Sequence, residues 1–237
     1  METVFNLSTK TGEIVTRLPE TSTILKKYKI DFCCGGNRPI GDVIAEKNLN
    51  GPDILEQLNS AFIKSLEKPS VTWDEMTNKE LIHHIITTHH QFLNLILPEL
   101  SQFTTKVFRV HGNHCPELAQ VHKLFHSLKI DLEQHTIEEE NVVFPLIEAF
   151  EEQLAKEQMR ELTAKIGDME GDHEGAGDLL RKLREVTNEY TAPDWACMTY
   201  QLTYQKLEQL ESDLFEHIHL ENNILFPRVL NELKEVQ

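Results

Sequence analysis

The chain has 237 residues, of which 40% are hydrophobic, and a formal net charge of -16. This length allows one large domain or a medium domain with a small partner, and the apolar fraction is sufficient for a core. An acidic surface argues against nucleic acid and anionic membranes as partners, because both would repel it.

No apolar run approaches the roughly 18 residues of a membrane-spanning helix, and the first residues lack signal-peptide features. Four cysteines, two of them adjacent, do not form a typical disulfide framework. We therefore expect a cytoplasmic protein with reduced thiols.

The first part of the chain, residues 1–66, predicts a small helical domain. Helical patterns run from Thr21 to Tyr28 and from Pro52 to Leu66, the first opened by residues that commonly cap helices. The segment Cys33-Cys34-Gly35-Gly36 lies between these patterns. The stretch 67–77 begins with polar residues and a proline, and we interpret it as a linker to a larger domain at 78–237.

Beyond the linker, the sequence is typical of an all-α protein with an up-down four-helix bundle. Four long amphipathic segments follow one another with almost no strand signal, at Asn78–Val110, Pro116–Phe150, Ala155–Glu189 and Pro193–Leu233. Long helices with short connections favour an up-down bundle. Pro98 is expected to kink the first helix, and Gly167 and Gly171 are expected to disturb the third.

One eleven-residue pattern, His-x3-Glu-x-Asn-x2-Phe-Pro, occurs twice, beginning at His135 and at His217. Residues four apart on a helix lie about 40° apart in azimuth and about 6 Å apart along the axis. Each copy therefore points an imidazole and a carboxylate at one place, from His135 and Glu139 and from His217 and Glu221. A single such pair is more often a surface ion pair, but two matching copies argue against coincidence. Two facing copies would supply most of a dinuclear metal site, because a carboxylate can bridge two ions.

The repeat extends to a preceding histidine in each half. His90 precedes His135 by 45 residues, and His173 precedes His217 by 44. Two helical hairpins around a pseudo-twofold axis would each donate three ligands. Four imidazoles and two carboxylates suit iron, manganese or zinc. The order and spacing differ from the Glu-x-x-His of ferritin-like proteins, so ferritin-type oxidation is set aside. In the first helix His89 also borders the apolar face, nearer its centre, so periodicity does not select His90.

Five further histidines are expected to lie outside this site and to face solvent. They are His122 and His126, on the other side of the helix from His135, His111 and His114, in a loop, and His219, about 200° around the helix from His217.

The adjacent thiols Cys33 and Cys34 require a separate interpretation. A disulfide between neighbours is strained, so a structural bridge is not expected. Their thiolates could bind a soft metal, react with an oxidant, or pass iron or a nitrosyl group to a client. Alternatively, they are small buried residues at a helix end. The isolated Cys115 and Cys197 are expected to be inert packing residues.

The segments Asp31-Phe32-Cys33-Cys34-Gly35-Gly36 and Leu97-Pro98-Glu99-Leu100, with the two His-x3-Glu pairs, closely resemble the iron–sulfur cluster repair di-iron proteins (RIC family, YtfE/ScdA-like). The resemblance covers nearly the whole chain. It implies an N-terminal ScdA-type domain and a hemerythrin-like bundle with two iron ions in a non-haem centre bridged by oxo and carboxylate groups. Residue by residue, it implies the ligands His90, His135, Glu139, His173, His217 and Glu221. His89 stands where a Tyr is expected, and it could tune the site or serve as a spare ligand.

The resemblance also implies a stress-response role, in which the protein supplies or traffics iron to rebuild clusters damaged by nitric oxide or peroxide. Its partners would be iron–sulfur scaffolds or proteins with damaged clusters. Two alternatives stay open: a hemerythrin-like carrier or sensor of oxygen or nitric oxide, and an enzyme that reduces nitric oxide or peroxide. The sequence does not determine the electron donor, the clients, or whether the chain forms a homodimer.

Overall fold

The protein is described by a computed structural model for residues 4–65, 73–150 and 156–236. Over these residues the structure is helical and has no strand beyond one isolated bridge between Lys10 and Pro39, so the all-α prediction is confirmed. The chain divides into two compact units, unit 1 (Met1–Leu81 with Phe215–Gln237) and unit 2 (Ile82–Leu214). Much of the predicted linker, 67–72, lies outside the described residues. Among the described helices, none combines the length and the apolar character needed to cross a bilayer.

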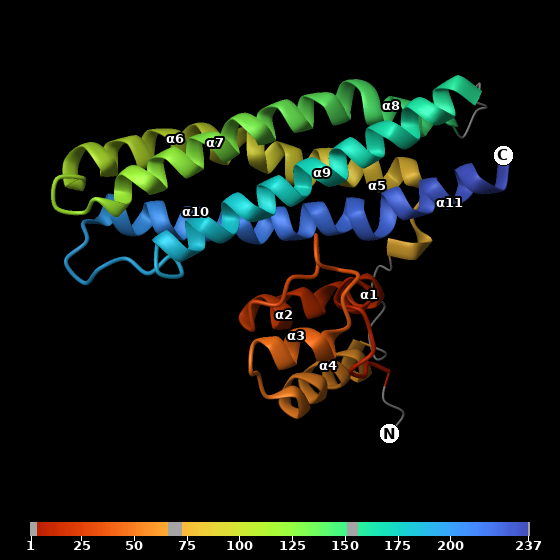
Figure 1. The fold of residues 1–237 in the computed structure, drawn as a ribbon, viewed down its shortest axis with the longest axis horizontal. Helices are drawn as coiled ribbons and strands as arrows, with labels where there is room; N and C mark the ends of the chain where they lie inside the picture. Colours follow the sequence, from red (N-terminus) through yellow and green to blue (C-terminus); the bar gives the residue numbers. More distant parts are fainter. Residues whose placement is uncertain (1–3, 66–72, 151–155, 237) are drawn as a thin grey trace. The chain divides into compact units, whose positions relative to one another are not determined.

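The N-terminal part of unit 1 is a cluster of short helices (Figure 1). They are α1 (Thr11–Arg17), η1 (Pro19–Thr21), α2 (Ser22–Lys27), α3 (Ile40–Glu46) and α4 (Gly51–Ser65). Lys29 and Asn48 adopt left-handed conformations just after α2 and α3, where they terminate these helices. The core contains the fully buried Phe5 and Phe32, and Phe215 from the last long helix packs against it. The rings of Phe32 and Phe215 meet edge to face with their centroids 5.9 Å apart.

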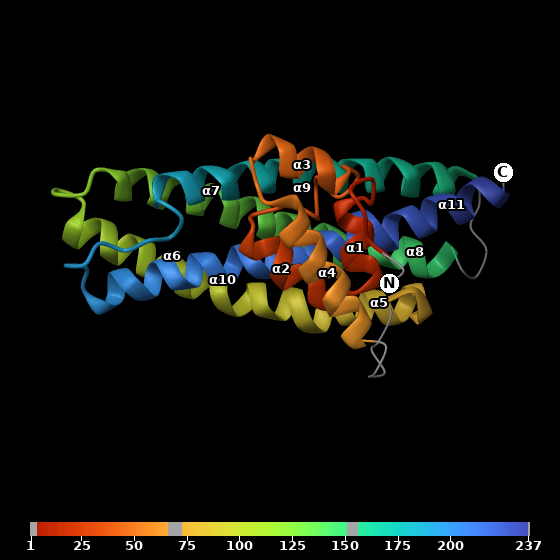
Figure 2. The same cartoon turned by 90° about the horizontal axis from the view of Figure 1, so that it is seen from below.

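Unit 2 contains four long helices that lie side by side (Figures 1 and 2). They are α6 (Gln91–His111), α7 (Glu117–Glu138), α9 (Lys156–Val186) and α10 (Met198–Leu220), of which α10 continues into unit 1. Ion pairs support the packing: Lys206 on α10 lies 2.9 Å from Glu99 on α6, and Arg184 on α9 lies 2.7 Å from Glu211 on α10. Buried residues recur at helical spacing along α7, at Leu118, Val121, Phe125, Leu128 and Leu132.

Three of the predicted long helices contain a widened, π-helical turn. These turns are η3 (Ile85–His90) between α5 (Asn78–His84) and α6, η4 (Glu139–Val143) between α7 and α8 (Phe144–Phe150), and η5 (Glu221–Leu225) between α10 and α11 (Phe226–Val236). At η4 and η5 the N–H of a phenylalanine binds the carbonyl of the glutamate five residues before it. The proline after this phenylalanine has no N–H to donate, so the regular hydrogen-bond ladder is already interrupted there. Such turns occur frequently at functional sites.

The third long helix differs from the prediction. Helix α9 runs without a break through Gly167 and Gly171, so the expected disturbance is wrong. The space beside both glycines is open, and each costs the helix only its low intrinsic propensity. Pro98 lies inside α6, which continues on both sides of it.

Candidate metal centre

In unit 2, a buried carboxylate stands between two histidines. Glu139, the first residue of η4, is completely buried. Its Oε1 lies 3.1 Å from Nε2 of His135, and its Oε2 lies 3.3 Å from Nε2 of His90. Nε2 of His173 lies 2.9 Å from Nε2 of His135. Three imidazoles from three helical segments therefore converge around one carboxylate in the interior.

The helices position these side chains through their apolar faces. His173 shares a face of α9 with the buried Met169, Ala176 and Leu180, so this face turns the imidazole inward with them. The ring of His90, in η3, stacks on Phe144, with centroids 5.8 Å apart. Phe144 belongs to the repeated Phe-Pro, so this part of the motif supports a histidine from another helix.

In unit 1, the second copy of the motif repeats the pairing of the first. His217 Nε2 lies 3.2 Å from Glu221 Oε1, and both side chains are buried. Glu221 begins η5 as Glu139 begins η4, so each His-x3-Glu spans the junction between an α-helix and a π-helical turn.

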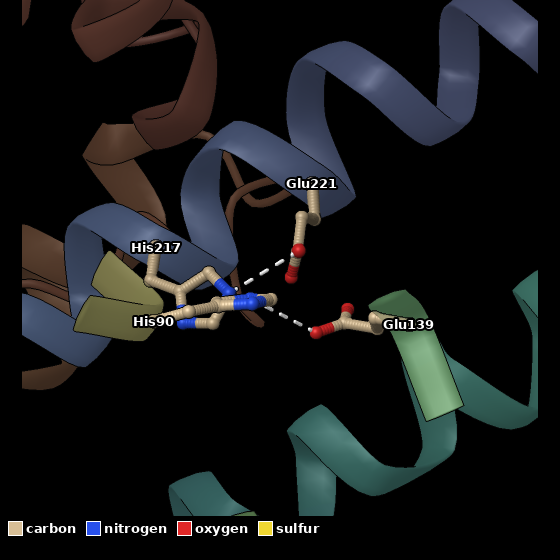
Figure 3. A group of neighbouring side chains, drawn as sticks. All are labelled: His90, Glu139, His217 and Glu221. Carbon is tan, nitrogen blue, oxygen red and sulfur yellow. Dashed lines mark hydrogen bonds and ion pairs between the residues drawn. The ribbon is translucent and has the colours of Figure 1, made fainter. Parts of the chain in front are cut away.

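The potential ligand atoms form two groups, in each of which all atoms lie within 4.8 Å of one another. One group contains His90, Glu139, His217 and Glu221, which point toward one another in Figure 3. The other contains His135, Glu139, His173 and Glu221. Each group has two histidines of its own, and both glutamates belong to both groups. These are the six residues of the predicted ligand set.

The donor set fits a cation. Glu139 and Glu221 are fully buried carboxylates, and a buried negative charge is costly unless a positive charge compensates it. Imidazole nitrogens and carboxylate oxygens together suit divalent first-row metals such as iron.

Two carboxylates that sequence reasoning missed lie behind the histidines. Glu140 Oε1 accepts a hydrogen bond of 2.7 Å from Nδ1 of His90, and Asp172 Oδ2 lies 3.5 Å from Nδ1 of His135. Such contacts fix the tautomer of a metal-binding histidine, so that its Nε2 presents a lone pair to the metal. Each carboxylate is adjacent in sequence to a predicted ligand: Glu140 follows Glu139, and Asp172 precedes His173. An acidic residue next to a predicted ligand was the sequence feature that could have indicated these carboxylates.

His89 turns away from both groups. Its Nδ1 lies 3.0 Å from Oδ1 of Asp213 in α10, and the side chain is buried. The structure therefore brings His90, and not His89, to Glu139. The pairing with Asp213 gives His89 a structural role in joining η3 to α10.

Several other histidines are less exposed than predicted. His219 is buried, not exposed: its Nδ1 lies 3.2 Å from the carbonyl of Phe32, and burial lowers its pKa to about 4. His122 and His126 are half-buried because their side of α7 faces α6, where they meet hydroxyl groups of Thr105 and Ser101. His111 is also half-buried, whereas His114 is exposed as expected.

The adjacent cysteines lie in the loop between α2 and α3 and form no disulfide. Cys33 is buried and Cys34 is partly exposed, with their sulfur atoms 3.8 Å apart. The Cys33 thiol also lies 3.2 Å from Oδ1 of Asp31. Its hydrogen bond to Cys34 and its burial raise the pKa of Cys33 well above the usual value. The interpretation as small buried residues therefore fits Cys33 but not Cys34, which is the accessible thiol of the pair.

The other two cysteines differ from each other. Cys115 is buried, as expected of a packing residue. Cys197 is exposed in the connection before α10, with its sulfur 3.3 Å from Nε2 of His111. Inert packing is therefore wrong for Cys197, because the connection that carries it lies at the surface.

Comparison with known proteins agrees with this geometry. The hemerythrin family, described as the hemerythrin HHE cation binding domain, matches residues 81–229, and the ScdA_N family, a domain of unknown function (DUF542), matches residues 7–62. A "Probable iron-sulfur cluster repair protein" of Haemophilus influenzae is 35% identical over 227 residues, which cover 94% of this chain and 97% of the relative. The "Iron-sulfur cluster repair protein YtfE" of an Escherichia coli strain is 34% identical over 220 residues, covering 92% and 95%. A protein of the same name from Escherichia fergusonii is 34% identical over 219 residues.

The hemerythrin match implies non-haem iron binding, and the buried His/Glu groups fit this ligand. The relatives align with more than nine-tenths of this chain and of their own length, at 34–35% identity, and this shows the family. The chain belongs to the family of iron–sulfur cluster repair proteins, with an ScdA_N domain followed by a hemerythrin domain.

Proposed function

We propose that this protein holds a pair of iron ions and supplies iron for the repair of iron–sulfur clusters damaged by nitrosative or oxidative stress. The observation that carries the proposal is the sharing of Glu139 and Glu221 by two groups of ligand atoms, each with two histidines of its own. The names of the relatives, repair proteins aligned over more than nine-tenths of this chain, supply the process. A cytoplasmic location belongs to the same proposal.

Each group would hold one iron ion, and the shared glutamates would bridge the two. This assignment gives His90 and His217 to one ion and His135 and His173 to the other. Glu139 is suited to bridging because its two oxygens already face different histidines, at 3.1 and 3.3 Å. The bound pair would supply redox chemistry, and its affinity for the ligands would change with oxidation state.

The carboxylates behind the histidines would orient them for binding iron, and the shared glutamates would couple the binding of the two ions. Glu140 holds His90, and Asp172 lies behind His135, so these imidazoles are oriented before a metal arrives. Glu139 and Glu221 belong to both groups, so loss of either carboxylate as a ligand would weaken the binding of both ions.

Cys34 would be the thiol that receives iron or a nitrosyl group and passes it to a cluster scaffold or a damaged protein. It is the more accessible sulfur of the pair, while Cys33 is buried beside it and held protonated. The loop that carries both cysteines contacts η5, the turn that begins with Glu221. Thiolates bind iron and react with nitric oxide and oxidants, so this position suits transfer.

The test is iron transfer from the purified, iron-loaded protein to an apo iron–sulfur scaffold supplied with sulfide. We expect cluster absorbance to appear on the scaffold with the wild type, to slow with Cys34→Ser, and to be absent with Glu139→Ala, which should not hold iron. In cells, deletion should slow the recovery of cluster-dependent enzymes after nitric oxide treatment. The proposal would be contradicted if no iron reached the scaffold and cluster-dependent enzymes recovered normally in the deletion strain. A stable, reversible oxygen adduct without transfer would favour a carrier instead.

A further inference from the structure

The asparagine of the repeated motif has a different role in each copy. In the first copy, the exposed side chain of Asn141 donates a hydrogen bond of 2.7 Å to the carbonyl of Ile137 in its own helix. In the second copy, the side chain of Asn223 donates to the carbonyls of Phe32 and Cys33, at 3.3 and 3.0 Å. The corresponding residue therefore leaves its own helix and binds the backbone of the cysteine loop.

Two glycines make room for the Asn223 side chain. A β-carbon added at Gly12 would lie 2.5 Å from Oδ1 of Asn223, and one added at Gly36 would also collide with this atom. The N–H of Gly12 donates a 2.9 Å hydrogen bond to the carbonyl of Gly36, which holds the two glycines together. The second glycine of the Cys-Cys-Gly-Gly segment is thus required by the close approach of the Asn223 side chain and of the Phe32 carbonyl.

His219 contacts the same loop one helical turn before Asn223. Its Nδ1 lies 3.2 Å from the carbonyl of Phe32, and its ring meets the Phe32 ring edge to face at 5.6 Å. His219 and Asn223 are four residues apart, so they share a helix face. This face lies on the other side of the helix from the one that carries His217.

From these contacts we propose that Asn223 is a positioning residue that fastens the Cys33–Cys34 loop to the η5 turn, two residues after Glu221. With the loop fastened, Cys33 stays buried and Cys34 is presented to solvent. A movement of η5 would then move the thiols with it. Breaking the hydrogen bonds of Asn223 would release the loop. The proposal rests on the proposed function only for the identity of the cargo, since the fastening concerns the thiols themselves.

The test is the rate at which iodoacetamide labels Cys33 and Cys34, resolved by mass spectrometry on the iron-loaded full-length chain. In Asn223→Ala, two hydrogen bonds to the loop are lost, and we expect labelling of Cys33 to accelerate roughly tenfold. The matched control is Asn141→Ala, which removes the corresponding residue of the other copy and should leave both rates unchanged. Asn223→Asp keeps the size but turns a carboxylate toward two carbonyl oxygens, so it should release the loop without creating a cavity.

A second pair of variants separates fastening from general stability. Gly12→Ala should also accelerate labelling of Cys33, because its new methyl group meets Asn223. Adding Asn223→Ala removes that collision and leaves the milder contact with the Gly36 carbonyl at 3.1 Å, so the double variant should label only slightly faster than Asn223→Ala alone. Gly41→Ala is the control, since its β-carbon would meet the backbone oxygen of Leu7 and not Asn223, and its effect should multiply with that of Asn223→Ala.

The possible results decide between distinct conclusions. Unchanged protection of Cys33 in Asn223→Ala and Asn223→Asp, or a Gly12→Ala effect that simply multiplies with that of Asn223→Ala, would overturn the proposal. Loss of bound iron with intact protection of Cys33 would assign Asn223 to the metal turn and would also overturn it. If the thiols respond as expected while the wild type transfers no iron to a scaffold, the fastening stands and the proposed repair function fails.

Discussion

The two copies of the repeated motif have the same local structure and different surroundings. Each copy places its histidine and glutamate at the junction of an α-helix and a π-helical turn. Two residues after the histidine, the first copy has Ile137, which is 62% exposed, and the second has His219, which is 1% exposed. The repeat therefore specifies the inward side, which carries the proposed ligands, in both copies. The opposite side differs: in the second copy it binds the cysteine loop.

The residue after each glutamate also differs between the copies. Glu140 follows Glu139 and accepts the hydrogen bond from His90, whereas Asn222, a neutral amide, follows Glu221. At this position the first copy thus adds a negative charge next to His90, and the second copy has a neutral residue. The two copies share the proposed ligands but not the residue that follows the glutamate.

The largest expected effect comes from removing a shared glutamate. Glu139→Ala or Glu221→Ala should abolish binding of both iron ions, because each carboxylate belongs to both groups of ligand atoms. His90→Ala and His173→Ala each remove a ligand of one group only and should leave partial iron content. Iron analysis of the four purified variants checks this order. If a glutamate variant retained as much iron as a histidine variant, the carboxylates would not be shared.

The next effect concerns the carboxylate that follows the glutamate of the first copy. Glu140→Ala removes the acceptor of the His90 hydrogen bond, and we expect iron affinity to fall by about 10- to 100-fold. Asn222→Ala is the matched control from the second copy, and it should change affinity much less. Competition with a chromophoric chelator measures both, and equal losses in the two variants would contradict the assigned role of Glu140.

Substitution of the buried His219 should destabilise the protein more than substitution of Ile137, the exposed residue at the same position of the first copy. His219→Ala removes a buried ring and a hydrogen bond to Phe32, and it should lower the free energy of unfolding by about 1–3 kcal/mol. Ile137→Ala truncates an exposed side chain and should stay within about 0.5 kcal/mol of the wild type. Urea denaturation of the iron-loaded proteins compares them. Similar losses would show that the two faces are equally covered in solution.

The smallest effect is expected in the protein stripped of iron. Without a cation, the buried carboxylate of Glu139 destabilises the fold, so Glu139→Gln should raise the stability of the metal-free protein by about 1 kcal/mol. The same substitution should weaken iron binding, so the order of stability should reverse when iron is added to the wild type. Thermal unfolding with and without chelator reveals the reversal. A metal-free Glu139→Gln protein less stable than the metal-free wild type would contradict the burial argument.

The sequence predicted the helical fold and the His-x3-Glu pairs because both depend on short-range periodicity. It did not choose between His89 and His90, since α-helical periodicity placed His89 nearer the apolar face. The π-helical turn η3 has more residues per turn than an α-helix, so the side chains at its end point in different directions from those of a regular α-helix. A prediction from α-helical periodicity does not include this rotation. The azimuth of His219 was predicted correctly and its exposure wrongly, because the loop that covers it comes from a segment far away in sequence.

The most direct test of the central claim is Mössbauer spectroscopy of the iron-loaded wild-type protein, combined with its iron content per chain. We expect two iron ions per chain, antiferromagnetically coupled through their bridges, with similar parameters because each has two histidines and shares both glutamates. A single iron per chain, or two ions without magnetic coupling, would contradict it.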